Sequence, residues 1–131
     1  MSVIPSLAAG LVQLQALANY LDSGSNNATF VFYDDTKPTN VNTVANPSAK
    51  LVTLTFPKPC FKQLNIDGIE LNQTDAAIVI RAGTAVWARL YNGNGDVVAD
   101  FEVGADIILN NPALALGASL TLDSIILKPE V

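Results

Sequence analysis

The sequence Ala-Val-Trp-Ala-Arg-Leu-Tyr at 85–91, then Asn-Gly-Asn-Gly at 92–95 and Asp-Val-Val-Ala-Asp-Phe-Glu-Val at 96–103, decides the fold. Two alternating apolar runs flank a turn whose glycines and asparagines tolerate the positive φ angles of tight hairpins. The pattern therefore predicts a long β-hairpin.

The alternation gives each arm of this hairpin two faces. In the first arm, the two faces carry Val86, Ala88 and Leu90 and, opposite them, Trp87, Arg89 and Tyr91. In the second arm, they carry Val97, Ala99, Phe101 and Val103 and, opposite them, Val98, Asp100 and Glu102. We expect one side of the hairpin to be dry and the other wet.

Residues 5–22 are predicted to form the long helix of the chain. One stripe of this helix carries Leu7, Leu11, Leu14, Leu17 and Leu21. Pro5 suits a first helical turn, and Gly24 is a stop signal. The stripe packs either on the chain's own sheet or on a neighbouring subunit, and the sequence leaves both open.

Beyond this helix the strong patterns have period two and predict strands. These strands are 28–33, 51–56, a short hairpin or bulged strand at 64–71 around Asp67-Gly68, 76–81, 107–109 and 120–127. With the central hairpin they make about eight strands, typical of a sandwich. We therefore expect one structural domain, with an N-terminal amphipathic helix (1–24) and an antiparallel β-sandwich (25–131), jelly-roll-like or immunoglobulin-like. The polar stretch 34–50 is too long for a simple connection and is predicted to be a functional or partner-ordered loop.

The composition of the chain limits the kinds of partner that it can bind. Of the 131 residues, 50% are hydrophobic and 15% charged, against roughly 25% charged in ordinary globular chains. Either the surface is rich in uncharged polar residues, or much of it is covered in an assembly. The net charge is −5 and the basic residues are scattered, which argues against nucleic acid. No apolar run reaches the length of a membrane span. The N-terminus lacks a basic leader, so we expect no targeting segment.

Groups for chemistry are few, because the chain has no histidine. Cys60 is a single cysteine, which fits a reducing cytoplasm, and we expect a buried core residue more than a nucleophile. Asp34-Asp35 could hold calcium, but adjacent acids in a loop are more often turn formers and solvated charge.

Three further groups on the central hairpin could form a functional site, but each also has a purely structural interpretation. The spacing Asn92-x-Asn94-x-Asp96 resembles a calcium loop, yet Val97 replaces the required glycine, so we interpret it as a turn. Asp100 and Glu102 could frame an acid pair or simply line a wet sheet. Trp87 beside Arg89 could contact a ligand or partner, or could cover the arginine stem. We predict no catalytic, cofactor-binding or metal residues and no enzymatic activity.

A series of motifs resembles one family. These motifs are the helix ending in Leu-Asp-Ser-Gly, 28–34, 37–38, 51–56, 83–90, 92–98, 103–104 and 107–110. In this order they are similar to a family of small, uncharacterised structural proteins of tailed bacteriophages and prophages. The likeness runs from about residue 10 to the end and is weakest at 36–50 and 57–75.

The resemblance implies a virion component made in the host bacterial cytoplasm. We expect a capsid decoration or cement protein that binds the major capsid protein or other virion proteins as a homo-oligomer within a symmetric assembly. A tail, head–tail connector or baseplate subunit is the alternative. A different class is a carbohydrate-binding β-sandwich that uses Trp87 and Tyr91 as a stacking platform.

Overall fold

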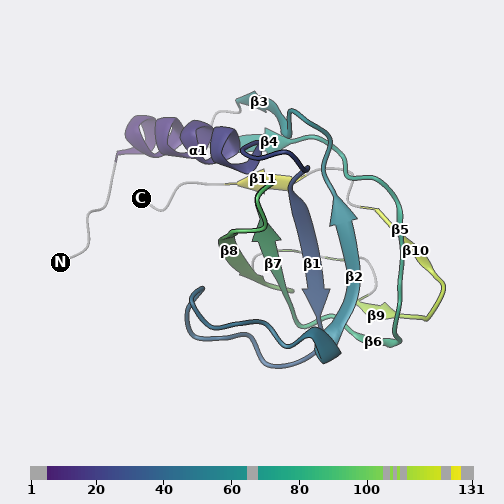
Figure 1. Ribbon diagram of the computed structural model, residues 1–131. Helices are drawn as coiled ribbons and strands as arrows, with labels where there is room; N and C mark the ends of the chain where they lie inside the picture. Colours follow the sequence, from purple (N-terminus) through teal and green to yellow (C-terminus); the bar gives the residue numbers. More distant parts are fainter. Residues whose placement is uncertain are drawn as a thin grey trace.

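A four-stranded antiparallel sheet lies at the centre of the computed structural model, which describes residues 6–64, 68–104, 107, 109, 112–121 and 125–127. Its strands run in the order β2 (Lys50–Thr55), β1 (Thr29–Tyr33), β7 (Trp87–Tyr91) and β8 (Val97–Glu102) (Figure 1). Strands β7 and β8 are the two arms of the predicted hairpin. The turn between them is closed by the Asn92 side chain, whose Oδ1 accepts hydrogen bonds from the backbone N–H groups of Asn94 and Asp96. The hairpin prediction is confirmed.

The described residues also form three smaller antiparallel sheets. The largest has the order β11 (Ile125–Leu127), β4 (Ile69–Leu71) and β3 (Phe61–Leu64). Strand β5 (Ala77–Ile78) pairs with β10 (Ser119–Leu120), and β6 (Gly83–Thr84) pairs with β9 (Ala113–Leu114). The architecture is mainly β and consistent with the predicted antiparallel sandwich with one N-terminal helix.

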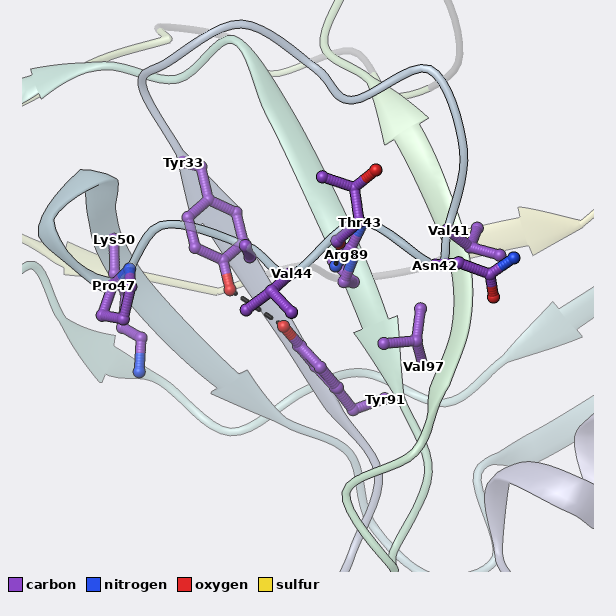
Figure 2. Close-up of a pocket in the computed structure, with 11 residues that line it drawn as sticks. Tyr33, Val41, Asn42, Thr43, Val44, Pro47, Lys50, Arg89, Tyr91 and Val97 are labelled. Carbon is purple, nitrogen blue, oxygen red and sulfur yellow. Dashed lines mark hydrogen bonds between the residues drawn. The ribbon is translucent and has the colours of Figure 1, made fainter.

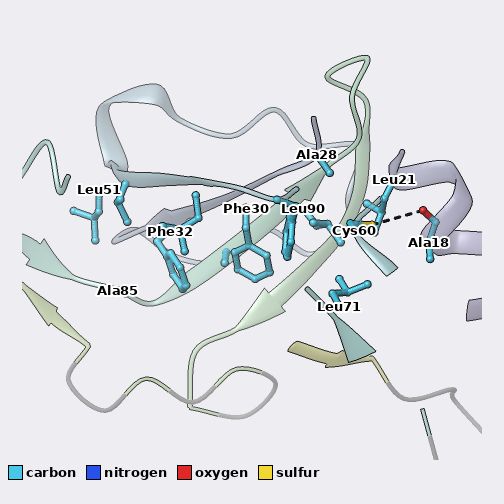
Figure 3. Close-up of a cluster of buried hydrophobic side chains, with 14 of the residues drawn as sticks. Ala18, Leu21, Ala28, Phe30, Phe32, Leu51, Cys60, Leu71, Ala85 and Leu90 are labelled. Carbon is cyan, nitrogen blue, oxygen red and sulfur yellow. Dashed lines mark hydrogen bonds between the residues drawn. The ribbon is translucent and has the colours of Figure 1, made fainter. Parts of the chain in front are cut away.

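The main hydrophobic core lies on the inner face of the four-stranded sheet. Phe30 and Phe32 of β1 project from that face, with ring centroids 5.2 Å apart, and Phe101 of β8 stacks on Phe30 at 5.5 Å. Strand β4 supplies Ile69 and Leu71 from the facing layer. Figure 3 shows this cluster reaching from Leu51 to the end of the helix. The alternation of β1 and β2 thus defines the inner face as predicted.

Helix α1 (Leu7–Leu21) begins after Ser6, whose side-chain oxygen accepts a hydrogen bond from the Ala9 N–H at 3.2 Å. The helix contacts β3 and β4. Ala18 and Leu21 are buried in the main core, and Leu14 and Leu17 pack against it. The C-terminal half of the leucine stripe, Leu14, Leu17 and Leu21, therefore packs on the chain's own core, which is the first of the two predicted arrangements. Pro5 lies outside the described residues.

The end of the helix is joined to the hairpin turn. The Gly93 N–H donates to the Leu21 carbonyl, and the Gly93 carbonyl accepts from the Asn26 N–H, both at 3.3 Å. A Cβ atom at Gly93 would overlap the carbonyl oxygens of Ser23 and Asn26. Gly24 has a φ of +94°, which ends the helix as predicted. The turn and the helix end therefore pack backbone against backbone.

The predicted assignment of faces in the second arm of the hairpin is wrong. The pairing shifts by one residue, because Leu90 pairs with Ala99 whereas Tyr91 pairs with Val97. Val98 is the extra residue of this bulge, and it packs against the main core. Val97 therefore shares the outer face with Tyr91 and does not share a face with Ala99 and Phe101, because one inserted residue reverses the alternation.

The expectation of one dry and one wet side also fails for the first arm. Trp87 and Arg89 on one face are buried, and so are Ala88 and Leu90 on the other. The cause is the long loop that follows β1, which covers the outer face of the sheet.

Several strand boundaries also differ from prediction. The predicted strand 76–81 is reduced to β5, and 120–127 divides into β10 and β11 with residues 122–124 outside the description. Strands β3 and β4 pair antiparallel around the 64–71 segment, in line with the hairpin alternative, and residues 65–67 lie outside the description. Of the predicted strand 107–109, Ile107 forms an isolated bridge to Val103, and residue 108 is not described.

Candidate functional site

The outer face of the four-stranded sheet carries a second, smaller cluster of side chains. Tyr33 and Trp87 stack with ring centroids 4.5 Å apart at 18°. Val31 and Ala49 are buried beside them. The hydroxyl of Tyr33 lies 3.0 Å from that of Tyr91, within hydrogen-bonding distance. Neighbours across an antiparallel ladder share a face, and the pairing of Tyr33 with Trp87 explains why the stack forms.

Arg89 is the charged centre of this face. Its Nε and Nη2 atoms donate to the two carboxylate oxygens of Asp100 at 2.6 and 3.0 Å, and Nη1 donates to the Thr43 carbonyl at 2.6 Å. The guanidinium carbon lies 5.1 Å from the centre of the Trp87 ring, within the range of a cation–π contact. The side chains of Arg89 and Asp100 are only 1% and 5% exposed. The arrangement is a buried ion pair that also holds a loop.

The loop over this face comprises residues 34–46 and leads into the short helix η1 (Pro47–Ala49). Its first residues are fixed by side chains. The Trp87 Nε1–H donates to Asp35 Oδ1 at 2.7 Å, and Asp34 forms an ion pair with Arg81 at 2.6 Å. Further along, Thr43 is held by Arg89. The two acids are therefore engaged with partners, and the expectation of solvated charge at Asp34-Asp35 is wrong.

Burial also changes the acid–base properties of these side chains. The pKa of the Tyr33 hydroxyl is raised far above its usual value. Desolvation by burial is the larger cause, and the hydrogen bond with Tyr91 is the second. The Asp100 hydrogen bonds raise the pKa of Arg89 above its already high value. Both groups stay protonated at neutral pH, so this face offers hydrogen-bond donors and not a general base.

An open pocket of about 300 Å³ lies between the loop and the sheet. Figure 2 shows the Tyr33 and Tyr91 hydroxyls meeting in its middle. Lys50 and Pro47 lie to one side of them in this view, and Arg89 and Val97 to the other. The volume is at the lower end of the range for small-molecule sites.

The pocket was not predicted, although two sequence signals pointed to the segment. One was the length of the polar stretch 34–50. The other was the pair of valines, Val41 and Val44, within it. Val44 is 88% exposed and lines the pocket. Apolar residues in an otherwise polar loop are informative when they are exposed together.

Other predicted candidates fall elsewhere or have structural roles. Asp100 binds Arg89, whereas Glu102 is exposed, so the two do not form an acid pair at a shared site. Cys60 is fully buried in the main core, as predicted, with its Sγ 3.7 Å from the Ala18 carbonyl (Figure 3). Burial and the nearby Asp22 raise the pKa of its thiol to about 12. A thiol in that environment is a poor nucleophile.

Trp87 is fully buried between Tyr33 and Arg89. It therefore offers no exposed ring for a sugar, and a stacking platform of Trp87 and Tyr91 is absent from this surface.

Within the part of the chain that the structure describes, no three His, Cys, Asp or Glu side chains gather as metal ligands would. The described residues also hold no helix that is long and apolar enough to cross a membrane.

The fold and this face define a class of protein: a mainly-β antiparallel sandwich with one N-terminal helix and a loop-covered pocket on the outer face of its central sheet. Comparison with protein-family models, with curated proteins and with solved structures found no match in any of the three.

Proposed function

We propose that this protein is a structural component of a tailed-bacteriophage virion, a capsid decoration or cement protein that binds the capsid surface. The observation that carries the proposal is a strip of exposed aliphatic side chains beside strands β5 and β10. Ile78, Ile80 and Leu116 are 59%, 62% and 69% exposed. The resemblance of the strand and turn motifs to phage structural proteins supports the same class.

The strip belongs to one pair of segments. Ile78 and Ile80 flank Val79, which is buried in the main core. The Val79 N–H donates to the Ala118 carbonyl, and the Gly117 N–H donates to the Val79 carbonyl, at 2.8 and 2.9 Å. These bonds place the segment that contains Leu116 beside the segment that contains Ile78 and Ile80. Alternation turns Val79 inward and leaves its two isoleucine neighbours outside.

Such a strip suits binding to another protein. Complete burial of one aliphatic side chain contributes about 1.5–3 kcal/mol, so three partly exposed ones can supply the apolar centre of a contact surface. In a symmetric shell, the same contact is repeated for every copy, and linked contacts increase overall avidity. The partner we propose is the major capsid protein, in an assembly that holds many copies of this chain.

The proposal includes no catalytic step. The pocket face presents the protonated Tyr33 hydroxyl and an arginine paired with Asp100, and the thiol of Cys60 is buried. These features supply neither a nucleophile nor a base, and they favour binding over catalysis.

Particles provide the first test. Tailed particles purified from the bacterium that carries the gene should contain the protein at a stoichiometric ratio to the major capsid protein, measured by quantitative mass spectrometry. Absence from particles overturns the proposal. Immunogold labelling of the head supports the decoration role, whereas labelling of the tail or baseplate replaces it with the tail-subunit alternative.

A second test addresses the exposed strip. Particles from a deletion strain are incubated with purified protein, and the bound amount is measured. Ile80→Asp should weaken rebinding at least about tenfold, because the contact would bury a charge in place of an apolar group. Val12→Asp is the matched control, since Val12 is equally exposed on helix α1, at 65%. Equal rebinding of both variants would remove the strip from the proposal.

A further inference from the structure

The pocket under the 34–46 loop combines one cationic side chain that is unpaired among the described residues, a pair of phenolic hydroxyls and apolar walls. We propose that it binds a small organic acid, a carboxylate attached to an apolar body. The inference rests on the position of Lys50, the state of the tyrosine pair and the size of the pocket. It is independent of binding to a virion.

Lys50 supplies the positive charge. It pairs with Tyr33 across β1 and β2, and cross-strand partners share a face, so its side chain lies on the pocket side of the sheet, as Figure 2 shows. Within the described residues, no carboxylate lies in ion-pairing distance of its ammonium group; the ion pairs there involve Lys62, Arg81 and Arg89. The charge of Arg89 is offset by Asp100. The pocket therefore keeps one unneutralised cation.

The tyrosine pair adds a donor. When one hydroxyl donates to the other across 3.0 Å, the accepting hydroxyl still has its own proton to donate. Burial keeps Tyr33 protonated, so when Tyr33 accepts from Tyr91 its own proton is available to a ligand at neutral pH. An ammonium group and an O–H donor that line the same pocket can each contact one oxygen of a carboxylate.

The other residues that line the pocket are apolar and favour a ligand whose carboxylate is attached to an apolar group. Val41, Val44, Pro47 and Val97 line the pocket, and Val44 is largely exposed. A volume of about 300 Å³ corresponds to about ten non-hydrogen atoms, taking the volume of one liquid water molecule for each. This is the size of a medium-chain fatty acid or a phenyl-substituted short acid.

The same features argue against other ligand classes. A phosphate site usually has several cations, an arginine fork or a nest of backbone N–H groups, whereas here the arginine fork is occupied by Asp100. A cationic ligand would meet Lys50 without a counter-charge among the lining residues. A sugar would need an exposed aromatic face, and Trp87 is buried.

Hexanoate is the probe for the test. Purified ¹⁵N-labelled protein is titrated with sodium hexanoate at neutral pH and constant ionic strength, with hexanol and hexylammonium in parallel. We expect saturable amide shifts at residues 41–45, Lys50 and Val97, with a dissociation constant on the order of 1 mM. Hexanol should bind at least about fivefold more weakly, since it lacks the charge that Lys50 recognises. Hexylammonium should not bind.

Variants locate the interaction. Lys50→Met keeps the length of the side chain and should weaken hexanoate about fivefold while leaving hexanol unchanged. Tyr91→Phe should weaken hexanoate by a smaller factor. Lys62→Met is the matched control, because Lys62 lies on strand β3, is paired with Glu70 and does not line the pocket; its affinity should equal that of the wild type.

Three results would overturn the proposal: no saturable shift at the pocket with hexanoate, equal affinity for hexanoate and hexanol, or an unchanged hexanoate affinity in Lys50→Met with an intact spectrum. Each is independent of particle binding, so failure here leaves the virion proposal standing.

Discussion

Replacing Asp100 with asparagine tests the buried ion pair most directly. The substitution keeps the shape of the side chain and removes its charge, which leaves the Arg89 guanidinium 1% exposed and without a counter-charge. Removal of one partner of a buried pair costs about 3–5 kcal/mol. Asparagine keeps one of the two acceptor oxygens, so one of the two hydrogen bonds from the guanidinium is lost as well.

The assay is urea unfolding at pH 7, followed by circular dichroism. A domain of this size has a free energy of unfolding of about 5–15 kcal/mol, so we expect Asp100→Asn to fold with a much lower midpoint and an unchanged slope. Lys62→Met breaks the half-exposed pair with Glu70 and should cost less than about 1 kcal/mol.

A double variant separates the cost of the unpaired charge from the cost of the lost hydrogen bonds. Arg89→Met with Asp100→Leu removes both charges and should recover most of the stability lost in Asp100→Asn, because the cost comes from the orphaned charge and not from the missing bonds. The Thr43 carbonyl, which loses its Arg89 donor, lies in an exposed loop where water can replace it. A loss below about 1 kcal/mol in Asp100→Asn, or a double variant less stable than the single one, would show that Arg89 is not desolvated.

Three further substitutions test other parts of the structure. Trp87→Ala should cost about 3–5 kcal/mol, as large core truncations do; a loss below about 1 kcal/mol in urea unfolding would show that the ring is not buried. Gly93→Ala should lose about 2–3 kcal/mol by overpacking against the helix end, whereas Gly95→Ala, with φ +84° and open space around it, should lose only about 1–2 kcal/mol; equal losses would contradict the close backbone approach. The thiol pKa of Cys60 is raised from 9.0 to about 12 on folding, so the unfolded state releases its proton first, and stability should fall between pH 9 and 12 by up to about 1.4 kcal/mol per pH unit. Cys60→Ala should flatten that part of the stability profile, and an unchanged profile would contradict the burial of the thiol.

The sequence predicted the elements whose signals are local. Asn-Gly-Asn-Gly between two alternating runs specifies a hairpin whatever surrounds it, and the leucine stripe with Gly24 specifies a helix and its end. The inner face of β1 and β2 followed from Phe30, Phe32 and Leu54 in the same way.

Features set by distant contacts were missed. The bulge at Val98 adds one residue to a run of apolar residues, and alternation alone cannot show where the extra residue sits. The sequence predicted one dry and one wet side of the hairpin, and it did not indicate that, besides the opposite face, the face of Trp87 and Arg89 is buried as well. Its burial depends on Asp100 across the ladder and on a loop more than forty residues away in the chain. The pocket depends on the same loop.

The backbone contact between the hairpin turn and the end of helix α1 has a consequence for how the molecule opens. Because Gly93 exchanges hydrogen bonds with Leu21 and Asn26, fraying of the helix end frees the tip of the central hairpin, and loosening of the tip frees the helix. Segments that separate together exchange their amide protons at one rate. Helix α1 therefore belongs to the same cooperative unit as the central hairpin, and a chain that begins at residue 25 would lack the Leu21 carbonyl that accepts from Gly93.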